Sequence, residues 1–211
     1  MKAVIIKNMD LQSKGLIMLF CFLISTISLQ ADGAYVFEES ADSVVSMEAE
    51  HFFDCHATDG LEWKVLPHYG KTLSAVTILP TTINPSGSNL VYRMKINSKV
   101  SQVKVHVFMA PTLNFDGHDG LFYNISFDSE LPVKVNVNGG VSEWQISNWQ
   151  KNRINIKTTT LTLPVKADKS HNLIFAPLNA GIVIEKIVVD CGGLRYSYLG
   201  PPESEFIKVK K

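Results

Sequence analysis

The sequence contains little of what marks several large classes of protein. Its 211 residues include only 3 cysteines, which excludes the dense disulfide network of small secreted scaffolds. Two of these cysteines, Cys55 and Cys191, lie beyond the N-terminal segment. A single disulfide between them is one alternative, and two unbonded thiols are the other. The 20 basic and 20 acidic residues cancel, which gives no electrostatic reason to expect a nucleic-acid partner. Phosphate-binding loops, dinucleotide fingerprints and recognisable Ser–His–Asp triads are also missing from the sequence.

The N-terminal segment combines a basic start with a short apolar run at residues 15–24. About ten apolar residues are too few for a membrane span of roughly 18, and the pattern is typical of a secretory signal peptide. We expect a signal peptide over residues 1–31, cleaved after Ala31, and therefore an exported protein without a membrane span. Cleavage after a neighbouring small residue and an uncleaved signal anchor are the alternatives.

The rest of the chain alternates between apolar and polar residues in short segments. Val45, Met47 and Ala49 share one face of the first segment, as in a half-buried strand. Further short segments of strand character occur at residues 73–79, 90–96, 103–109, 121–127, 133–137, 154–156, 161–163, 173–175 and 182–189. No helical stripe of useful length is present. The pattern predicts an all-β fold, an antiparallel β-sandwich or jelly roll, over residues 44–204. Residues 32–43 are expected as a polar lead-in, and residues 205–211 as a charged tail.

Seven segments carry a resemblance to a known family. They lie at residues 45–52, 63–67, 74–77, 110–114, 120–123, 186–190 and 192–204. The most specific segment ends in Leu-Gly-Pro-Pro-Glu-Ser at residues 199–204, whereas Glu-Ala-Glu at residues 48–50 is common to many carbohydrate-binding sandwiches. Together and in this order, the segments resemble the C-terminal domain of glycoside hydrolase family 115.

The resemblance implies a β-sandwich similar to carbohydrate-binding modules. Enzymes of that family are α-glucuronidases that act on xylan, and their catalytic residues lie on a barrel domain upstream of this one. A glycosidase needs two carboxylates about 5–10 Å apart, and no such pair can be assigned here. We therefore expect a non-catalytic accessory module that binds a polysaccharide or oligosaccharide, namely a uronic-acid-bearing xylan. The alternative is a structural domain that docks onto a separately encoded glycoside hydrolase.

Three acidic residues are candidates for a structural metal site. Glu48 and Glu50 lie two residues apart, so their carboxylates leave the same face of one strand. Glu185 belongs to the last strand, which often neighbours the first in a jelly roll. Calcium takes six to eight oxygen ligands, and modules that resemble this one hold a calcium between such strands. The alternative is that Lys186 or another base pairs with these carboxylates at the surface.

Candidate sugar-binding residues combine aromatic rings with polar loop residues. Sugar rings present apolar C–H faces, so their sites use exposed aromatics together with a few oriented polar groups. The predicted carbohydrate-binding residues are Trp63, Tyr69, Asn114, Asp116, Asp119 and Asn179. For Trp63 the alternative is packing in the core, and for the polar residues it is turn formation.

Overall fold

A computed structural model describes residues 34–114, 120–138 and 156–210 of the chain. The predicted signal peptide, residues 1–31, lies outside the described residues. The strands are β1 (Ala34–Glu38), β2 (Val44–Glu48), β3 (Asp54–His56), β4 (Glu62–Leu66), β5 (Ala75–Leu79), β6 (Asn89–Lys95), β7 (Gln102–Met109), β8 (Phe122–Phe127), β9 (Val133–Asn136), β10 (Ile156–Thr162), β11 (Ser170–Pro177), β12 (Val183–Asp190) and β13 (Phe206–Val209). In these three stretches no helix has the length and hydropathy that crossing a membrane requires.

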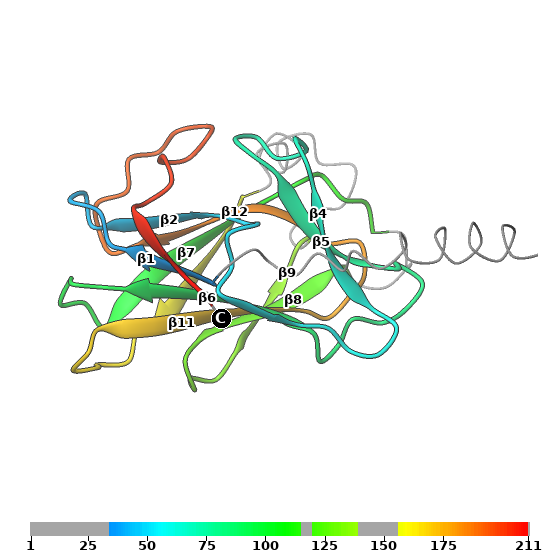
Figure 1. The fold of residues 1–211 in the computed structure, drawn as a ribbon, viewed down its shortest axis with the longest axis horizontal. Helices are drawn as coiled ribbons and strands as arrows, with labels where there is room; N and C mark the ends of the chain where they lie inside the picture. The colour runs from blue at the N-terminus through cyan, green and yellow to red at the C-terminus, as the bar shows by residue number, and fades with distance from the viewer. Residues whose placement is uncertain (1–33, 115–119, 139–155, 211) are drawn as a thin grey trace, which may run out of the picture. The chain divides into compact units, whose positions relative to one another are not determined.

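The strands form two sheets that pack face to face (Figure 1). The seven-stranded sheet, called sheet A, has the order β13-β1-β6-β11-β8-β9, with β3 also paired to β6. The six-stranded sheet, called sheet B, has the order β10-β7-β12-β5-β4, with β2 also paired to β12. Among the described strands only β1 and β6 pair in parallel. The predicted all-β, antiparallel sandwich is confirmed.

The core lies between the two sheets and follows from the alternation of side chains. In β6, Leu90, Tyr92 and Met94 are fully buried, while the residues between them face outward. The Tyr92 hydroxyl donates a hydrogen bond to the Ala49 carbonyl oxygen at 2.7 Å. Burial raises the pKa of Tyr92, and this hydrogen bond gives the buried hydroxyl its partner.

Both ends of the predicted domain differ from expectation. Residues 34–38, expected as a polar lead-in, form β1, and residues 206–209, expected as a charged tail, form β13. The two strands pair antiparallel, and Phe37 of β1 is fully buried against the edge of the Phe206 ring. Burial of the Phe37 ring and its contact with Phe206 outweigh the polar composition around them.

Two further expectations are settled by the described strands. The segments at residues 154–156 and 161–163 belong to one region, where β10 runs from Ile156 to Thr162 along β7. No disulfide joins Cys55 and Cys191: Cys55 is exposed on β3 and Cys191 is buried after β12. Burial raises the pKa of the Cys191 thiol to about 12, so this thiol stays protonated at neutral pH.

Candidate functional site

The outer face of sheet B is where the most unusual side chains of the fold lie. β2, β5 and β12 are buried along nearly their whole length, so both of their faces are covered. The strand registers place two rows of side chains across this outer face. One row contains Ile156, Phe108, Lys186 and Glu48, and the next contains Thr158, His106, Val188 and Ser46.

A cover for this face is provided by residues 192–204, called the closing loop. The Ser46 N–H donates to the Ser204 hydroxyl at 2.9 Å, and the Ser204 N–H donates back to the Ser46 carbonyl at 2.9 Å. The Glu203 carboxylate accepts from the Glu48 N–H at 3.0 Å and lies 2.7 Å from Nδ1 of His51. The final residues of the closing loop therefore bind β2 much as a further strand would.

A buried ion pair lies beneath the closing loop. Nζ of Lys186 is 3.0 Å from Oε1 of Glu48, and both side chains are almost fully buried. The same ammonium donates to the carbonyls of Leu199 at 3.3 Å and Pro201 at 3.1 Å, while the Thr72 hydroxyl donates to Oε1 of Glu48 at 2.7 Å. Lys186 thus fixes the Gly-Pro turn of the closing loop from below, because a buried ammonium needs these acceptors.

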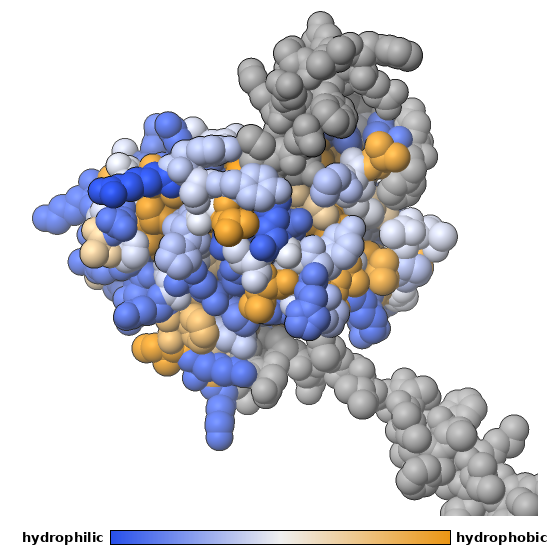
Figure 2. Space-filling model, turned by 90° about the horizontal axis from the view of Figure 1, so that it is seen from above, coloured by the Kyte–Doolittle hydropathy of each residue, from blue (hydrophilic) through white to orange (hydrophobic). Residues whose placement is uncertain are grey.

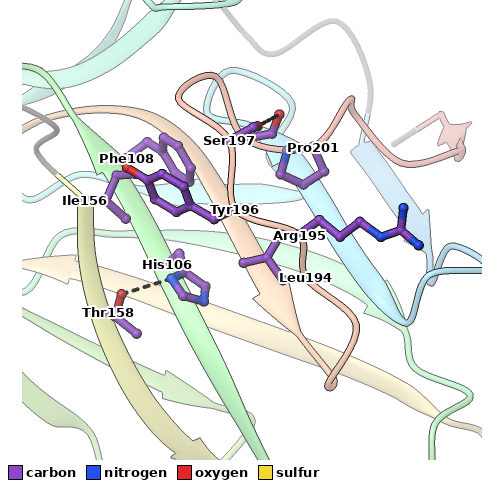
Figure 3. Close-up of a pocket in the computed structure, with 10 residues that line it drawn as sticks. His106, Phe108, Ile156, Thr158, Leu194, Arg195, Tyr196, Ser197 and Pro201 are labelled. Carbon is purple, nitrogen blue, oxygen red and sulfur yellow. Dashed lines mark hydrogen bonds between the residues drawn. The ribbon is translucent and has the colours of Figure 1, made fainter.

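A pocket of about 280 Å³ opens beside this loop. His106 and Phe108 of β7 and Ile156 and Thr158 of β10 form its floor, and closing-loop residues form its wall (Figure 3). The wall residues are Leu194, Arg195, Tyr196, Ser197, Gly200 and Pro201. This volume lies just below the roughly 300–1,000 Å³ of pockets for drug-sized ligands, which suits a ligand of about one ring.

His106 and Thr158 are the polar residues in the floor of this pocket. Nδ1 of His106 lies 2.9 Å from the Thr158 hydroxyl oxygen, as the dashed line in Figure 3 marks. Nε2 of His106 is buried and has no hydrogen-bond partner among the described residues. Burial lowers the pKa of His106 more than nearby Asp190 raises it, so the imidazole is neutral at pH 7. A buried nitrogen without a partner costs about 1–3 kcal/mol, which a hydrogen-bonding ligand would recover.

Tyr196 gives the wall of the pocket an aromatic surface. Its side chain is 72% exposed and lies beside Phe108 and Ile156 in Figure 3. The Arg195 guanidinium points away from these rings and into solvent. The pocket therefore combines two aromatic rings with a hydroxyl–imidazole pair, and its described lining contains no carboxylate.

Two of the three predicted calcium ligands, Glu48 and Glu185, lie beside lysines. Glu48 is paired with Lys186, so the alternative of a basic partner is the one observed, although the pair is buried rather than at the surface. The Glu185 carboxylate lies 3.9 Å from Nζ of Lys71. Burial raises the pKa of Glu185 more than Lys71 lowers it. Among the described residues no cluster of three His, Cys, Asp or Glu side chains could hold a metal, and Glu50 joins none. Ammonium groups beside Glu48 and Glu185 do not fit a calcium site.

The two predicted aromatic residues differ in accessibility. Trp63 is only 8% exposed, and its indole N–H donates to the His56 carbonyl at 2.9 Å. Its ring is part of the core, so the ring offers no exposed face on which a sugar could stack. Tyr69 is 57% exposed in the loop after β4 and could contact a ligand there.

Of the predicted polar residues, Asn114 and Asn179 belong to loops at one end of the sandwich. Oδ1 of Asn179 accepts the Phe122 N–H at 2.9 Å, which joins the loop before β12 to the start of β8. Asn138 joins the same region to the loop of Asn114 by donating to the Thr112 carbonyl at 3.2 Å. The Asn179 side chain thus links two loop segments in this structure. Asp116 and Asp119 lie outside the described residues.

The pocket residues were not predicted from the sequence. His106 and Phe108 alternate with buried valines in β7, which is the usual pattern of solvent-facing positions. A signal was present in the closing loop, because Tyr196 and Tyr198 stand in a Gly- and Pro-rich segment where exposed aromatics have no core to pack into.

The sequence matches the model of a known protein family. The model of the glycosyl hydrolase family 115 C-terminal domain matches residues 36–203. No curated protein matched the sequence. A solved structure described as a family GH115 4-O-methyl-α-glucuronidase, BtGH115A, with specificity for decorated arabinogalactans, is 19% identical, with a TM-score of 0.51. The match covers 68% of this chain and 17% of that chain, so this chain spans about one sixth of the enzyme.

Two carbohydrate-binding modules are also similar to this chain. The C-terminal CBM6 of LamC from Zobellia galactanivorans is 18% identical over 70% of this chain and 98% of that chain, with a TM-score of 0.44. The family 35 module from Clostridium thermocellum is 16% identical over 69% of this chain and 98% of that chain, with a TM-score of 0.43. The family match spans most of the sequence, including the closing loop except its last residue. The chain belongs to the glycosyl hydrolase family 115 C-terminal domain family.

Proposed function

We propose that this chain is a non-catalytic accessory module that binds carbohydrate, with one sugar residue in the pocket beside the closing loop. The observation that carries the proposal is the unpartnered Nε2 of His106 in a pocket that also offers the rings of Phe108 and Tyr196. An apolar surface with one or two oriented polar groups is the combination that sugar binding uses.

A sugar hydroxyl suits His106 for a chemical reason. The neutral imidazole has one donor and one acceptor nitrogen, and Nδ1 is already engaged with Thr158. Whichever tautomer is present, Nε2 needs either an acceptor or a donor from the ligand. A hydroxyl group is both, so it satisfies Nε2 in either tautomer.

The ligand class we propose is a uronic-acid-bearing xylan or its fragments, bound by an exported protein. The family supports this ligand class. The apolar run at residues 15–24, which is typical of an export signal, supports export. Docking on a separately encoded glycoside hydrolase is the competing role. Docking calls for a broad apolar patch, whereas on the one face that Figure 2 shows the described residues form small hydrophobic patches separated by hydrophilic ones.

The test is calorimetric titration with a panel of neutral and acidic xylo-oligosaccharides. We expect Tyr196→Ala to weaken binding about tenfold, because an aromatic contact contributes about 1 kcal/mol or more. Tyr69→Ala is the matched control, since Tyr69 is also an exposed tyrosine but lies outside the pocket. Binding that falls in Tyr69→Ala and not in Tyr196→Ala would move the site to the sequence-predicted loops. No binding of any glycan would refute the proposed function.

A further inference from the structure

The outer face of sheet A carries an arginine in an unusual setting. Arg93 is on β6, between the fully buried Tyr92 and Met94, so its side chain points away from the core. Its neighbours across the sheet are Val36 of β1 and Asn172 of β11. Arg93 is partly buried there, on the opposite side of the sandwich from the pocket of sheet B.

Two contacts fix the plane of the Arg93 guanidinium. Its central carbon lies 3.5 Å from the centre of the Phe53 ring, which is a close cation–π stack. Its Nε–H donates to Oδ1 of Asn172 at 2.9 Å. A guanidinium has five N–H donors, so the two terminal amino groups keep four of them for another partner.

Arg93 also lacks the counter-charge that nearby basic residues have. On the same strand, Nζ of Lys95 lies 3.2 Å from the Glu38 carboxylate, and in the loop before β11, Nζ of Lys166 lies 2.6 Å from the Asp128 carboxylate. In the described part of the chain no carboxylate lies within 4.0 Å of a guanidinium nitrogen of Arg93. A stacked guanidinium with free terminal groups is a preorganised fork for a planar carboxylate.

We propose that Arg93 forms a second binding site, which takes the carboxylate of a uronic acid residue. The β11 residue across from Arg93 is Asn172, and Ser170 is the next outward position of β11 on one side; both side chains offer hydrogen-bonding groups to a hydroxylated ligand. The inference rests on the proposed function for its sugar class, but not on the pocket for its geometry.

The test is an NMR titration with glucuronic acid, with glucose and acetate as matched probes. The sequence has three arginines, namely Arg93, Arg153 and Arg195. The Arg93 Nε signal is therefore assigned as the one that disappears in Arg93→Gln. We expect glucuronic acid to shift the Arg93 Nε signal and the amide signals of Phe53 and Asn172. Arg93→Gln should weaken this binding about tenfold or more, because charge-assisted, bidentate hydrogen bonds are lost.

Lys134→Gln is the control variant. Lys134 also lies over an aromatic ring, with Nζ 4.2 Å from the centre of Phe122, but on a different strand of the same sheet. Its loss should leave glucuronic acid binding unchanged, and raised salt should weaken binding in the wild type. No shift at Arg93, an unchanged affinity in Arg93→Gln, or equal shifts with acetate would overturn the proposal. Signals from Tyr196 and His106 report on the pocket separately, so neutral sugars can still show the proposed function if Arg93 fails.

Discussion

The two outer faces of the sandwich differ in how they treat polar residues. On sheet A, β6 and β11 alternate between buried and partly exposed residues, and the polar side chains reach solvent. On sheet B, β2 and β12 carry Glu48, Glu185 and Lys186 on strands with almost no exposed position. The same alternating sequence therefore leads to an open face in one sheet and a covered, charged face in the other.

The cause of this difference is the closing loop rather than the strands. On sheet B it lays Leu194 against the small apolar cluster of Val44, Phe108 and Val188. It also supplies the carbonyls that the Lys186 ammonium needs. Where the closing loop leaves β7 and β10 partly uncovered, the pocket remains. The most specific motif of the sequence thus has a structural role, and the candidate binding site lies at its margin.

The largest expected effect is the difference in unfolding free energy lost when a buried ion pair and an exposed ion pair are broken. Lys186→Ala leaves the Glu48 carboxylate buried without its partner, which should cost about 3–5 kcal/mol of unfolding free energy. Lys95→Ala removes the exposed pair with Glu38 on sheet A and should cost about 0–1 kcal/mol. Urea unfolding measures both.

A double variant keeps this comparison interpretable if the single variant does not fold. Glu48→Leu combined with Lys186→Met removes both charges, and it should be more stable than Lys186→Ala. Equal, small losses in Lys186→Ala and Lys95→Ala would contradict the view that the closing loop seals this pair from water.

A smaller effect is expected for the hydrogen bonds that fasten the closing loop. Ser204→Ala leaves the buried N–H of Ser46 without its acceptor, which should cost about 1–3 kcal/mol. Ser170→Ala, at a partly exposed outward position of sheet A, should change stability by about 0.5 kcal/mol or less. Equal unfolding midpoints for the two variants would mean that the closing loop is not fastened at Ser204.

The pH dependence should have opposite signs for one carboxylate in each sheet. Burial alone raises the pKa of Asp128, but hydrogen bonds from Lys166, His171 and the Asn172 N–H outweigh it and hold the pKa below 3.8. Its stabilisation is present above pH 3.8 and is lost as the pH falls through the lower folded value. Asp128→Asn should therefore destabilise the protein at pH 7.

Glu185 should behave in the opposite way. Burial raises its pKa above 4.5, so ionised Glu185 costs stability at pH 7, and protonation relieves this cost as the pH falls. Glu185→Gln should therefore raise the urea midpoint at pH 7 and reduce the gain on acidification towards pH 5. A lower midpoint in Glu185→Gln at pH 7 would show that its pairing with Lys71 outweighs burial.

The smallest expected effect concerns calcium. If Lys186 and Lys71 hold the two carboxylates, chelation with EDTA should leave the melting temperature unchanged. A fall in melting temperature that added calcium reverses would restore the predicted metal site on sheet B.

The fold was readable from the sequence because strand alternation is a local signal. Residues 103–109 and 182–189 were predicted within a residue or so of β7 and β12. β1 and β13 were missed because both are short and their partners are distant in sequence: β1 lies between β13 and β6, and β13 pairs with β1. Local composition cannot report such a pairing.

The candidate site was less readable, for the same reason. Glu48 follows the pattern of a solvent-facing residue, yet residues about 150 positions away bury it. Trp63 was a sugar-binding candidate with core packing as its alternative, and the structure shows core packing, with the indole N–H donating to the His56 carbonyl. His106 becomes distinctive only once β10 and the closing loop lie beside it.

A crystal structure of the protein with a bound xylo-oligosaccharide would test the central claim most directly. The account predicts a sugar ring against Tyr196, with one hydroxyl within hydrogen-bond distance of Nε2 of His106. A sugar bound instead at Tyr69, Asn114 and Asn179, with the closing-loop pocket unoccupied, would contradict it.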